Sequence, residues 1–150
     1  MRRKKSNSPI RQEHSQRARP GRSLLPLPDA EVRRRSLVAH LALAVCRTGK
    51  GNKYQLCELA RASYSAYFMW KSGLGSAEID TFIAAEEVLE SAAEQAEATG
   101  IWSLGANPLV ERVICLYDEQ LAAVTSAVLD ECEKQVARAI GGILTRRGVS

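Results

Sequence analysis

Aromatic residues and long apolar runs are scarce in this chain of 150 residues, and each scarcity excludes a class of structure. Aromatic residues make up 5% of the chain. Alanine, leucine, glutamate and valine dominate instead, which is typical of packed amphipathic helices and not of a β-sheet. No apolar run approaches the roughly 18 residues that cross a membrane, and the basic start at Met1 leads into polar residues. We therefore expect an all-α protein that is soluble and cytoplasmic.

Patterns for catalysis and for metal binding are also missing. The two histidines, His14 and His40, have no cysteine or carboxylate cluster near them at ligand or triad spacing. The four cysteines are widely separated and include no Cys-x-x-Cys pair: Cys46, Cys57, Cys115 and Cys132. Without a nucleophile paired to a base, or a set of metal ligands, we expect no enzyme, no metal and no cofactor. The cysteines are interpreted as small, reduced core residues, with a redox or disulfide role as the alternative.

Charge divides the chain into two unequal parts. Residues 1–35 carry eleven lysines and arginines against three acids, whereas the rest carries ten against fourteen. A basic segment rich in proline, serine and glutamine cannot bury enough apolar surface to offset the entropy of ordering it. We therefore predict a disordered basic arm over residues 1–28, followed by a helical domain over residues 29–150.

Two helices are predicted in the first half of this domain. Asp29 is a candidate N-cap for a helix over about residues 30–47. Its apolar positions at helical spacing predict this buried face: Val32, Leu37, Val38, Leu41 and Val45. After a glycine-containing loop, Asn52 is expected to cap a second helix that ends near Gly73. Its predicted face consists of Leu56, Leu59, Ala60, Ser63 and Tyr67.

The second half predicts a third helix and a long fourth one. Ser76 or Asp80 can cap the third helix, and Gly100 is expected to end it. Its predicted buried stripe is Ile79, Phe82, Ile83, Leu89, Ala93 and Ala96. Asn107 followed by Pro108 predicts the start of a fourth helix, whose apolar spacing continues to the C-terminus over a rod of ~55 Å. The expected fold is an antiparallel bundle of about four helices, in which the long C-terminal helix overhangs and forms the seam of a homodimer.

Basic residues outside the acidic body are the candidate nucleic-acid contacts. Three consecutive arginines begin the first helix, where the helix dipole disfavours them unless an anion or acidic side chains compensate. The loop over residues 49–53 places two lysines and free backbone donors at a helix start, either as an anion pocket or as a plain turn. The candidate nucleic-acid-binding residues are Arg2, Arg3, Lys4, Lys5, Arg33, Arg34, Arg35, Lys50 and Lys53.

Two further patterns have a nucleic-acid interpretation and a structural one. Residues 59–65 partly match a DNA-binding helix-turn-helix, but Tyr64 stands where the turn requires glycine, which favours one continuous helix. A cluster of rings could stack on nucleobases or pack in the core: Tyr64, Tyr67, Phe68 and Trp70. For both patterns we favour the structural interpretation.

A protein-binding role is the competing interpretation of the body. No lysine or arginine occurs between Lys71 and Arg112, and eight acids fall there. This acidic third helix is either a solvated face or a docking surface for a basic partner, including the chain's own arm. The leucines and prolines of residues 24–28 either lie across the body or bind a partner.

Several short segments resemble a family of small proteobacterial proteins. The likeness covers roughly residues 37–145 and is carried by the Gly49-Lys50-Gly51-Asn52 loop, Leu56, Leu59-Ala60, the junction at 99–102 and the stretch 117–121. Some of these proteins are labelled Fis-like transcriptional regulators. The resemblance implies a helical bacterial protein with a role in transcription regulation, and no catalytic residue is carried over from it. The leading hypothesis is a non-enzymatic nucleic-acid-associated accessory or regulatory protein that binds mainly phosphates; the alternative is a protein-interaction adaptor.

Overall fold

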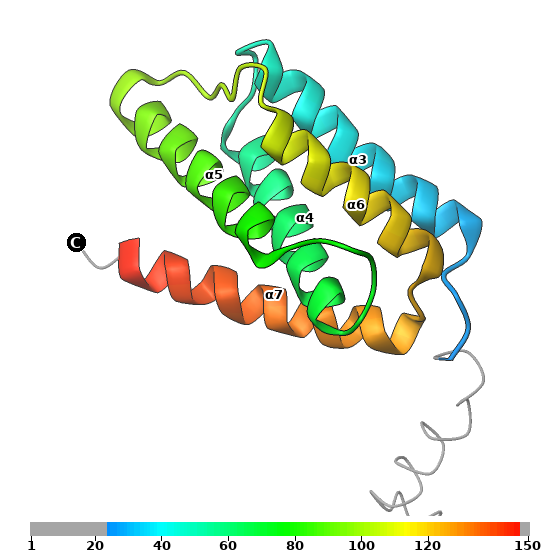
Figure 1. Ribbon diagram of the computed structural model, residues 1–150. Coiled ribbons are helices and arrows are strands. Elements are labelled where there is room, and N and C mark those ends of the chain that lie inside the picture. Colours follow the sequence, from blue (N-terminus) through cyan, green and yellow to red (C-terminus); the bar gives the residue numbers. More distant parts are fainter. Residues whose placement is uncertain (1–23, 148–150) are drawn as a thin grey trace, which may run out of the picture.

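A computed structural model describes residues 24–147 of the chain, and its side chains up to Gly142. The predicted arm therefore lies almost entirely outside the described residues. Within that range the protein is all-helical, without any β-strand, and forms five helices (Figure 1). Their bounds are α3 Asp29–Arg47, α4 Lys53–Lys71, α5 Ile79–Thr99, α6 Pro108–Ala123 and α7 Ser126–Arg147.

Helix α4 is the centre of the bundle and packs against each of the other four helices. Helices α3, α5 and α6 run alongside it, while α7 crosses it obliquely and has α4 as its main partner (Figure 1). All five helices contribute to the core, and its large side chains without exposed surface include Leu59 and Met69 of α4 and Ile114 and Leu121 of α6. Burying such side chains supplies most of the stabilisation, at about 1.5–3 kcal/mol for each large one.

The starts of α4 and α6 confirm two predicted N-caps. The Asn52 side chain accepts hydrogen bonds from the backbone of Tyr54 and Gln55, and the Gln55 side chain accepts one from Asn52 N in return. The Asn107 side chain accepts from the first turn of α6, which begins at Pro108. These short-range pairings satisfy amide donors that a helix start leaves free.

Two other predicted caps are wrong. The N-cap of α3 is Pro28 and that of α5 is Glu78, and neither uses a side-chain hydrogen bond. At α3 the Pro28 carbonyl accepts from Glu31 N at 2.9 Å and Val32 N at 3.1 Å, so the backbone alone starts the helix. Asp29 therefore lies inside its helix, and Ser76 and Asp80 do not cap α5.

The predicted buried face of α3 is wrong at three of its five positions, whereas Val32 packs against the core and Val45 is half-buried. Its buried residues are Ala39, Ala42, Leu43 and Cys46. Leu37 and Leu41 are 58% and 55% exposed, and Val38 is 39% exposed. Small side chains allow α3 to lie close to α4 and α6, which explains why alanines and not leucines face the core. The same error affects Ile79 and Ile83 of α5, which are each 48% exposed, while Phe82, Leu89 and Ala96 are buried as predicted.

The predicted long fourth helix is divided into α6 and α7. Val124 leaves the helical conformation with ψ 142°, and the next residue, Thr125, forms an isolated antiparallel bridge with Pro26. Leu25 O accepts from Ser126 N at 3.2 Å, so the Leu-Pro segment pairs with the junction. Leu27 packs against the core, as one interpretation of that segment predicts, while Leu24 and Leu25 are exposed.

The cysteines differ in their surroundings. All four are free; Cys46 and Cys132 are buried, whereas Cys57 and Cys115 are exposed. The core interpretation is therefore confirmed for the first pair and wrong for the second.

Candidate binding surfaces

The three arginines of α3 are largely compensated by carboxylates. Arg34 donates two hydrogen bonds to Glu31, at 3.1 and 2.6 Å. Arg35 donates to the same carboxylate at 2.8 Å and also to Glu133 of α7. Arg33 is exposed and has no ion pair among the residues that the structure describes. Acidic side chains thus balance Arg34 and Arg35 at this helix start, whereas Arg33 keeps its charge unpaired within the described residues.

Glu31 and Arg35 form the centre of this charge network. The hydrogen bond from Arg34, with further bonds and charge from Arg35, lowers the pKa of Glu31 to about 2. Partial burial acts to lower the pKa of Arg35, but its bonds to Glu133 and Glu31 raise it on balance. Burial raises the pKa of the neighbouring Tyr117 phenol. Arg35 is therefore a fixed cation that ties α3 to α7 beside α6.

Several backbone amides in the loop over residues 49–53 and in the first turn of α4 already donate hydrogen bonds within the chain. Two amides that could bind an anion, those of Tyr54 and Gln55, already donate to the Asn52 side chain. Gly51 bridges to Trp102, and a Cβ on it would lie 2.9 Å from the Trp102 carbonyl oxygen. The glycine is thus explained by close packing.

The predicted nucleic-acid residues that the structure describes do not form a single cluster. Lys50 and Lys53 are exposed, without an ion pair within the described range, beyond the C-terminal end of α3. Arg33 lies near the other end of that helix, about 21 Å from its last residue at 1.5 Å per residue. Arg2, Arg3, Lys4 and Lys5 lie outside the described residues.

The aromatic residues of α4 pack mainly with α5. The ring centroids of Tyr67 and Trp70 lie 5.6 and 5.3 Å from that of Phe82. Tyr67, Phe68 and Trp70 are half-buried against the core, which confirms the packing interpretation. Helix α4 is continuous from Lys53 to Lys71, so the helix-turn-helix interpretation is excluded for this segment.

An acidic face covers the outer side of α5. We define it by five exposed glutamates: Glu86, Glu87, Glu90, Glu94 and Glu97. None of the five has an ion-pair partner in the part of the chain that the structure describes. This surface therefore presents unneutralised negative charge to a ligand.

A pocket of about 310 Å³, here called the aromatic pocket, adjoins this face between α4, α5 and α7. Glu86 belongs to both the pocket and the acidic face. The half-exposed Ile79 and Ile83 line it together with Tyr64, Tyr67, Phe68, Phe82 and Ala139. An apolar hollow thus lies directly beside a row of carboxylates.

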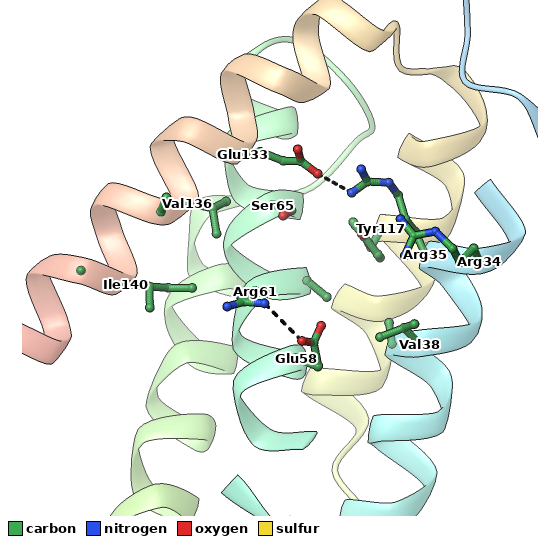
Figure 2. A pocket seen from close by; sticks show the side chains of 14 residues that line it. Arg34, Arg35, Val38, Glu58, Arg61, Ser65, Tyr117, Glu133, Val136 and Ile140 are labelled. Atoms are coloured by element: carbon green, nitrogen blue, oxygen red, sulfur yellow. Dashed lines mark hydrogen bonds and ion pairs between the residues drawn. The ribbon is translucent and has the colours of Figure 1, made fainter. Parts of the chain in front are cut away.

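A second hollow, the α3–α7 groove, has a volume of about 510 Å³ (Figure 2). Helix α3 forms one wall and α7 the other, with α4 between them, because α7 diverges from α3 beyond the Arg35–Glu133 ion pair. Its apolar lining comes from all three helices: Val38, Ala39, Ala62, Val136, Ala137 and Ile140. A second ion pair, Arg61 with Glu58 at 3.3 Å, lies on the α4 side.

A Ser-Asp-His cluster joins α3 and α6, and the sequence pattern gave no sign of it. Asp118 accepts from Ser36 Oγ at 2.7 Å, and its other oxygen lies 2.5 Å from His40 Nε2. The carboxylate lies between the serine and the histidine, and no hydrogen bond joins Ser36 to His40. A catalytic triad needs the histidine in the middle to take the serine proton, so this arrangement is a cross-link between helices.

Comparison with protein-family models, with curated proteins and with solved structures finds no match for this chain. Among the described residues, no three histidine, cysteine or acidic side chains are grouped so as to hold a metal ion. No helix in the described range has the length and apolarity to cross a membrane.

Proposed function

We propose that this protein is an adaptor that binds a basic amphipathic helix of a partner protein. The observation that carries the proposal is the aromatic pocket beside the unpaired carboxylates of α5. The pocket takes the apolar side of the partner helix, and the acidic face takes its lysines and arginines. The geometry is that of helix-in-groove recognition, in which apolar residues one turn apart anchor the ligand.

The apolar contribution comes from Ile79 and Ile83. These residues are one helical turn apart and each 48% exposed, so they form a ridge whose neighbours are aromatic rings. A partner residue that covers them removes apolar surface from water at about 25 cal/mol per Å². The pocket floor is held in place by Phe82, which is fixed between Tyr67 and Trp70.

The electrostatic contribution comes from the acidic face. Because α5 contains no lysine or arginine, its carboxylates act together on an approaching cation. Surface charges of this kind raise the association rate and favour the correct partner more than they raise affinity. The affinity for the partner helix should therefore fall as salt is added, while the share of the affinity that comes from apolar contact should persist at high salt.

The test uses three helical peptides of equal length: a basic amphipathic one, a scrambled one of the same composition, and an acidic amphipathic one. We expect the basic amphipathic peptide alone to bind, as measured by fluorescence anisotropy. The double variant Glu86→Lys/Glu90→Lys and the variant Ile83→Ser should each weaken binding at least tenfold. Charge reversal at exposed acids of other helices, Glu119→Lys/Asp130→Lys, is the matched control. Binding of all three peptides alike, or equal loss in the control, would contradict the proposal.

Nucleic-acid association through the arm is a second candidate, favoured by charge. Residues 1–23 contain eight lysines and arginines and one acid, and Arg33, Lys50 and Lys53 are exposed without ion pairs in the described range. Phosphate contacts of this kind give little base specificity and an affinity that falls steeply with salt.

A salt titration with labelled double- and single-stranded DNA tests this candidate. The full chain should be compared with a chain starting at Leu24, which keeps the Leu25–Ser126 hydrogen bond. Weaker binding and a smaller salt slope after truncation would support the arm as the contact. Equal affinity of both chains would contradict it.

A further inference from the structure

We propose that the α3–α7 groove is the interface of a homodimer, in which a second copy of this chain supplies the occupant. The occupant is the exposed ridge of α3, defined here as Leu37, Val38 and Leu41. The inference stands independently of the proposed partner helix, since the groove and the aromatic pocket share no lining residue.

Unpartnered apolar surface is concentrated on this side of α3. The three ridge residues are between 39% and 58% exposed and lie within about one turn of each other. Leucines placed outward on a helix whose alanines face inward leave an apolar stripe open to water. Across the groove, Val136, Ala137 and Ile140 of α7 offer a second apolar wall (Figure 2).

The charge of this surface permits two identical copies to meet. The charged residues of the groove are paired within the chain: Arg34 and Arg35 with Glu31, Arg35 with Glu133, and Arg61 with Glu58. Opposing copies therefore bring together neutralised pairs. The acidic face of α5, in contrast, would repel a second copy of itself, because like charges placed together in an interface are unfavourable.

The relative position of ridge and groove favours a closed pair. Val38 belongs to both, so the ridge lies at the edge of its own groove. When two copies are related by a two-fold axis, the ridge of each can enter the groove of the other, and all the complementary surface is used at once. A ridge on the far side from its groove would instead favour a head-to-tail contact, which either closes into a ring or continues as a filament.

The dimer replaces the seam that the sequence predicts along an overhanging fourth helix. That helix is divided at Val124 and Thr125, and α7 lies back across α4. The second wall of the groove exists only because of this break. The proposed homodimer thus uses the α3–α7 groove and not an overhanging C-terminal helix.

The test is sedimentation equilibrium and light scattering of the full chain over the micromolar range. We expect a dimer for the wild type and a monomer for Leu37→Glu/Leu41→Glu. The matched control is Tyr54→Glu/Ile101→Glu, at residues 79% and 59% exposed that lie outside both hollows, which should remain dimeric. A wild-type monomer throughout, or a dimer that survives the Leu37→Glu/Leu41→Glu change, would overturn the proposal.

A cross-linking experiment keeps the proposal testable if the glutamate variant fails to fold. Two chains, each carrying Cys57→Ser and Cys115→Ser, are mixed: one has the further change Leu41→Cys on the ridge and the other Ile140→Cys on the α7 wall of the groove. A short bismaleimide should then join the two chains covalently, whereas Ile101→Cys in place of Leu41→Cys should not cross-link. Absence of the cross-link between Leu41→Cys and Ile140→Cys would overturn the interface. These changes leave the aromatic pocket untouched, so the variants of the dimer interface should still bind the basic peptide. A chain that dimerises but binds no peptide would contradict the adaptor proposal and leave the dimer proposal standing.

Discussion

The Gln120 side chain of α6 donates a hydrogen bond to the Leu74 carbonyl oxygen at 3.1 Å, which fixes the loop between α4 and α5. The same amide donates to the Ala66 carbonyl oxygen at 3.0 Å. Gln120 is only 1% exposed, and its Oε1 has no partner among the described residues. One buried side chain thus holds the end of α4 against α6, and so positions the start of α5 and the aromatic pocket.

Replacing Gln120 by leucine should lower the free energy of unfolding by about 1–3 kcal/mol, because two carbonyl oxygens lose a buried donor. Part of this cost is offset, since the variant also removes the unpaired Oε1. Urea unfolding followed by circular dichroism measures the change. Gln95→Leu, at an exposed position of α5, should stay within about 0.5 kcal/mol of the wild type. Equal stability of the two variants would contradict the prediction of a net loss.

Gly51→Ala and Gly141→Ala should change the stability of the protein in opposite directions, because only Gly51 is closely packed. A Cβ at Gly51 would lie 2.9 Å from the Trp102 carbonyl oxygen and 3.0 Å from Cys46 Sγ, so Gly51→Ala should destabilise by about 1–3 kcal/mol. Gly141, inside α7, has no atom within 4 Å of its Cβ position. Gly141→Ala should therefore stabilise by about 0.5–1 kcal/mol. Thermal unfolding measures both, and a loss of stability in both variants would contradict the prediction.

The lowered pKa of Glu31 predicts a pH-dependent contribution to stability. Since the folded-state pKa is about 2, against 4.5 for the free side chain, the carboxylate stabilises the fold above about pH 4.5. That contribution is lost as the pH falls from 4.5 towards 2. Glu31→Gln should therefore cost up to about 1 kcal/mol at pH 7, because the pair is partly exposed, and almost nothing near pH 2.

Urea unfolding of the wild type and of Glu31→Gln at several pH values gives this difference directly. Glu94→Gln, which changes a glutamate of α5 without an ion pair in the described range, is the control for loss of one negative charge. A difference for Glu31→Gln that is constant from pH 7 to pH 2 would show that its carboxylate is not held by the arginines.

Two of the four cysteine thiols should react fast with a maleimide in the native protein, and the other two slowly. Cys57 and Cys115 are exposed, whereas burial raises the pKa of Cys46 and Cys132 and limits access to them. Because the thiolate is the reactive form, a maleimide should label two thiols in the native protein and four in urea. Mass spectrometry of the intact and digested protein identifies them. Rapid native labelling of Cys46 would mean that α3 separates from the core.

Local sequence predicts the elements whose signals are short-range. Asn52, and Asn107 with Pro108, each mark a helix start, and both predicted N-caps are confirmed. The face of α3 could not be predicted in this way, since two stripes share the helical spacing. One is built on Leu37 and Leu41 and the other on Ala39 and Ala42. Which of them is buried depends on how closely α4 and α6 approach, and that is a property of the whole bundle.

The candidate surfaces depend even more on contacts that are distant in sequence. Arg35 reaches Glu133 across 98 residues, and His40 reaches Asp118 across 78. The acidic run of α5 was visible from composition, but the aromatic pocket beside it requires Ile79 and Ile83 to be exposed. Apolar periodicity alone places both isoleucines in the core.

The break between α6 and α7 gives the last prediction. Apolar spacing continues through Val124, which is fully buried, so the pattern cannot distinguish one helix from two. Proline does. In the middle of a continuous helix it costs ~3 kcal/mol or more, whereas the first residue of a helix accepts it. Ser126 is that first residue of α7, and Thr125 before it is extended in its bridge with Pro26, which suits a following proline.

Ser126→Pro should therefore cost only about 1 kcal/mol, which corresponds to loss of the hydrogen bond from Ser126 N to Leu25 O. Ala122→Pro and Ala137→Pro, inside α6 and α7, should each cost ~3 kcal/mol or more. Urea unfolding of the three variants ranks them. If Ser126→Pro were as damaging as the other two, α6 and α7 would form one helix in solution, and the second wall of the α3–α7 groove would not exist.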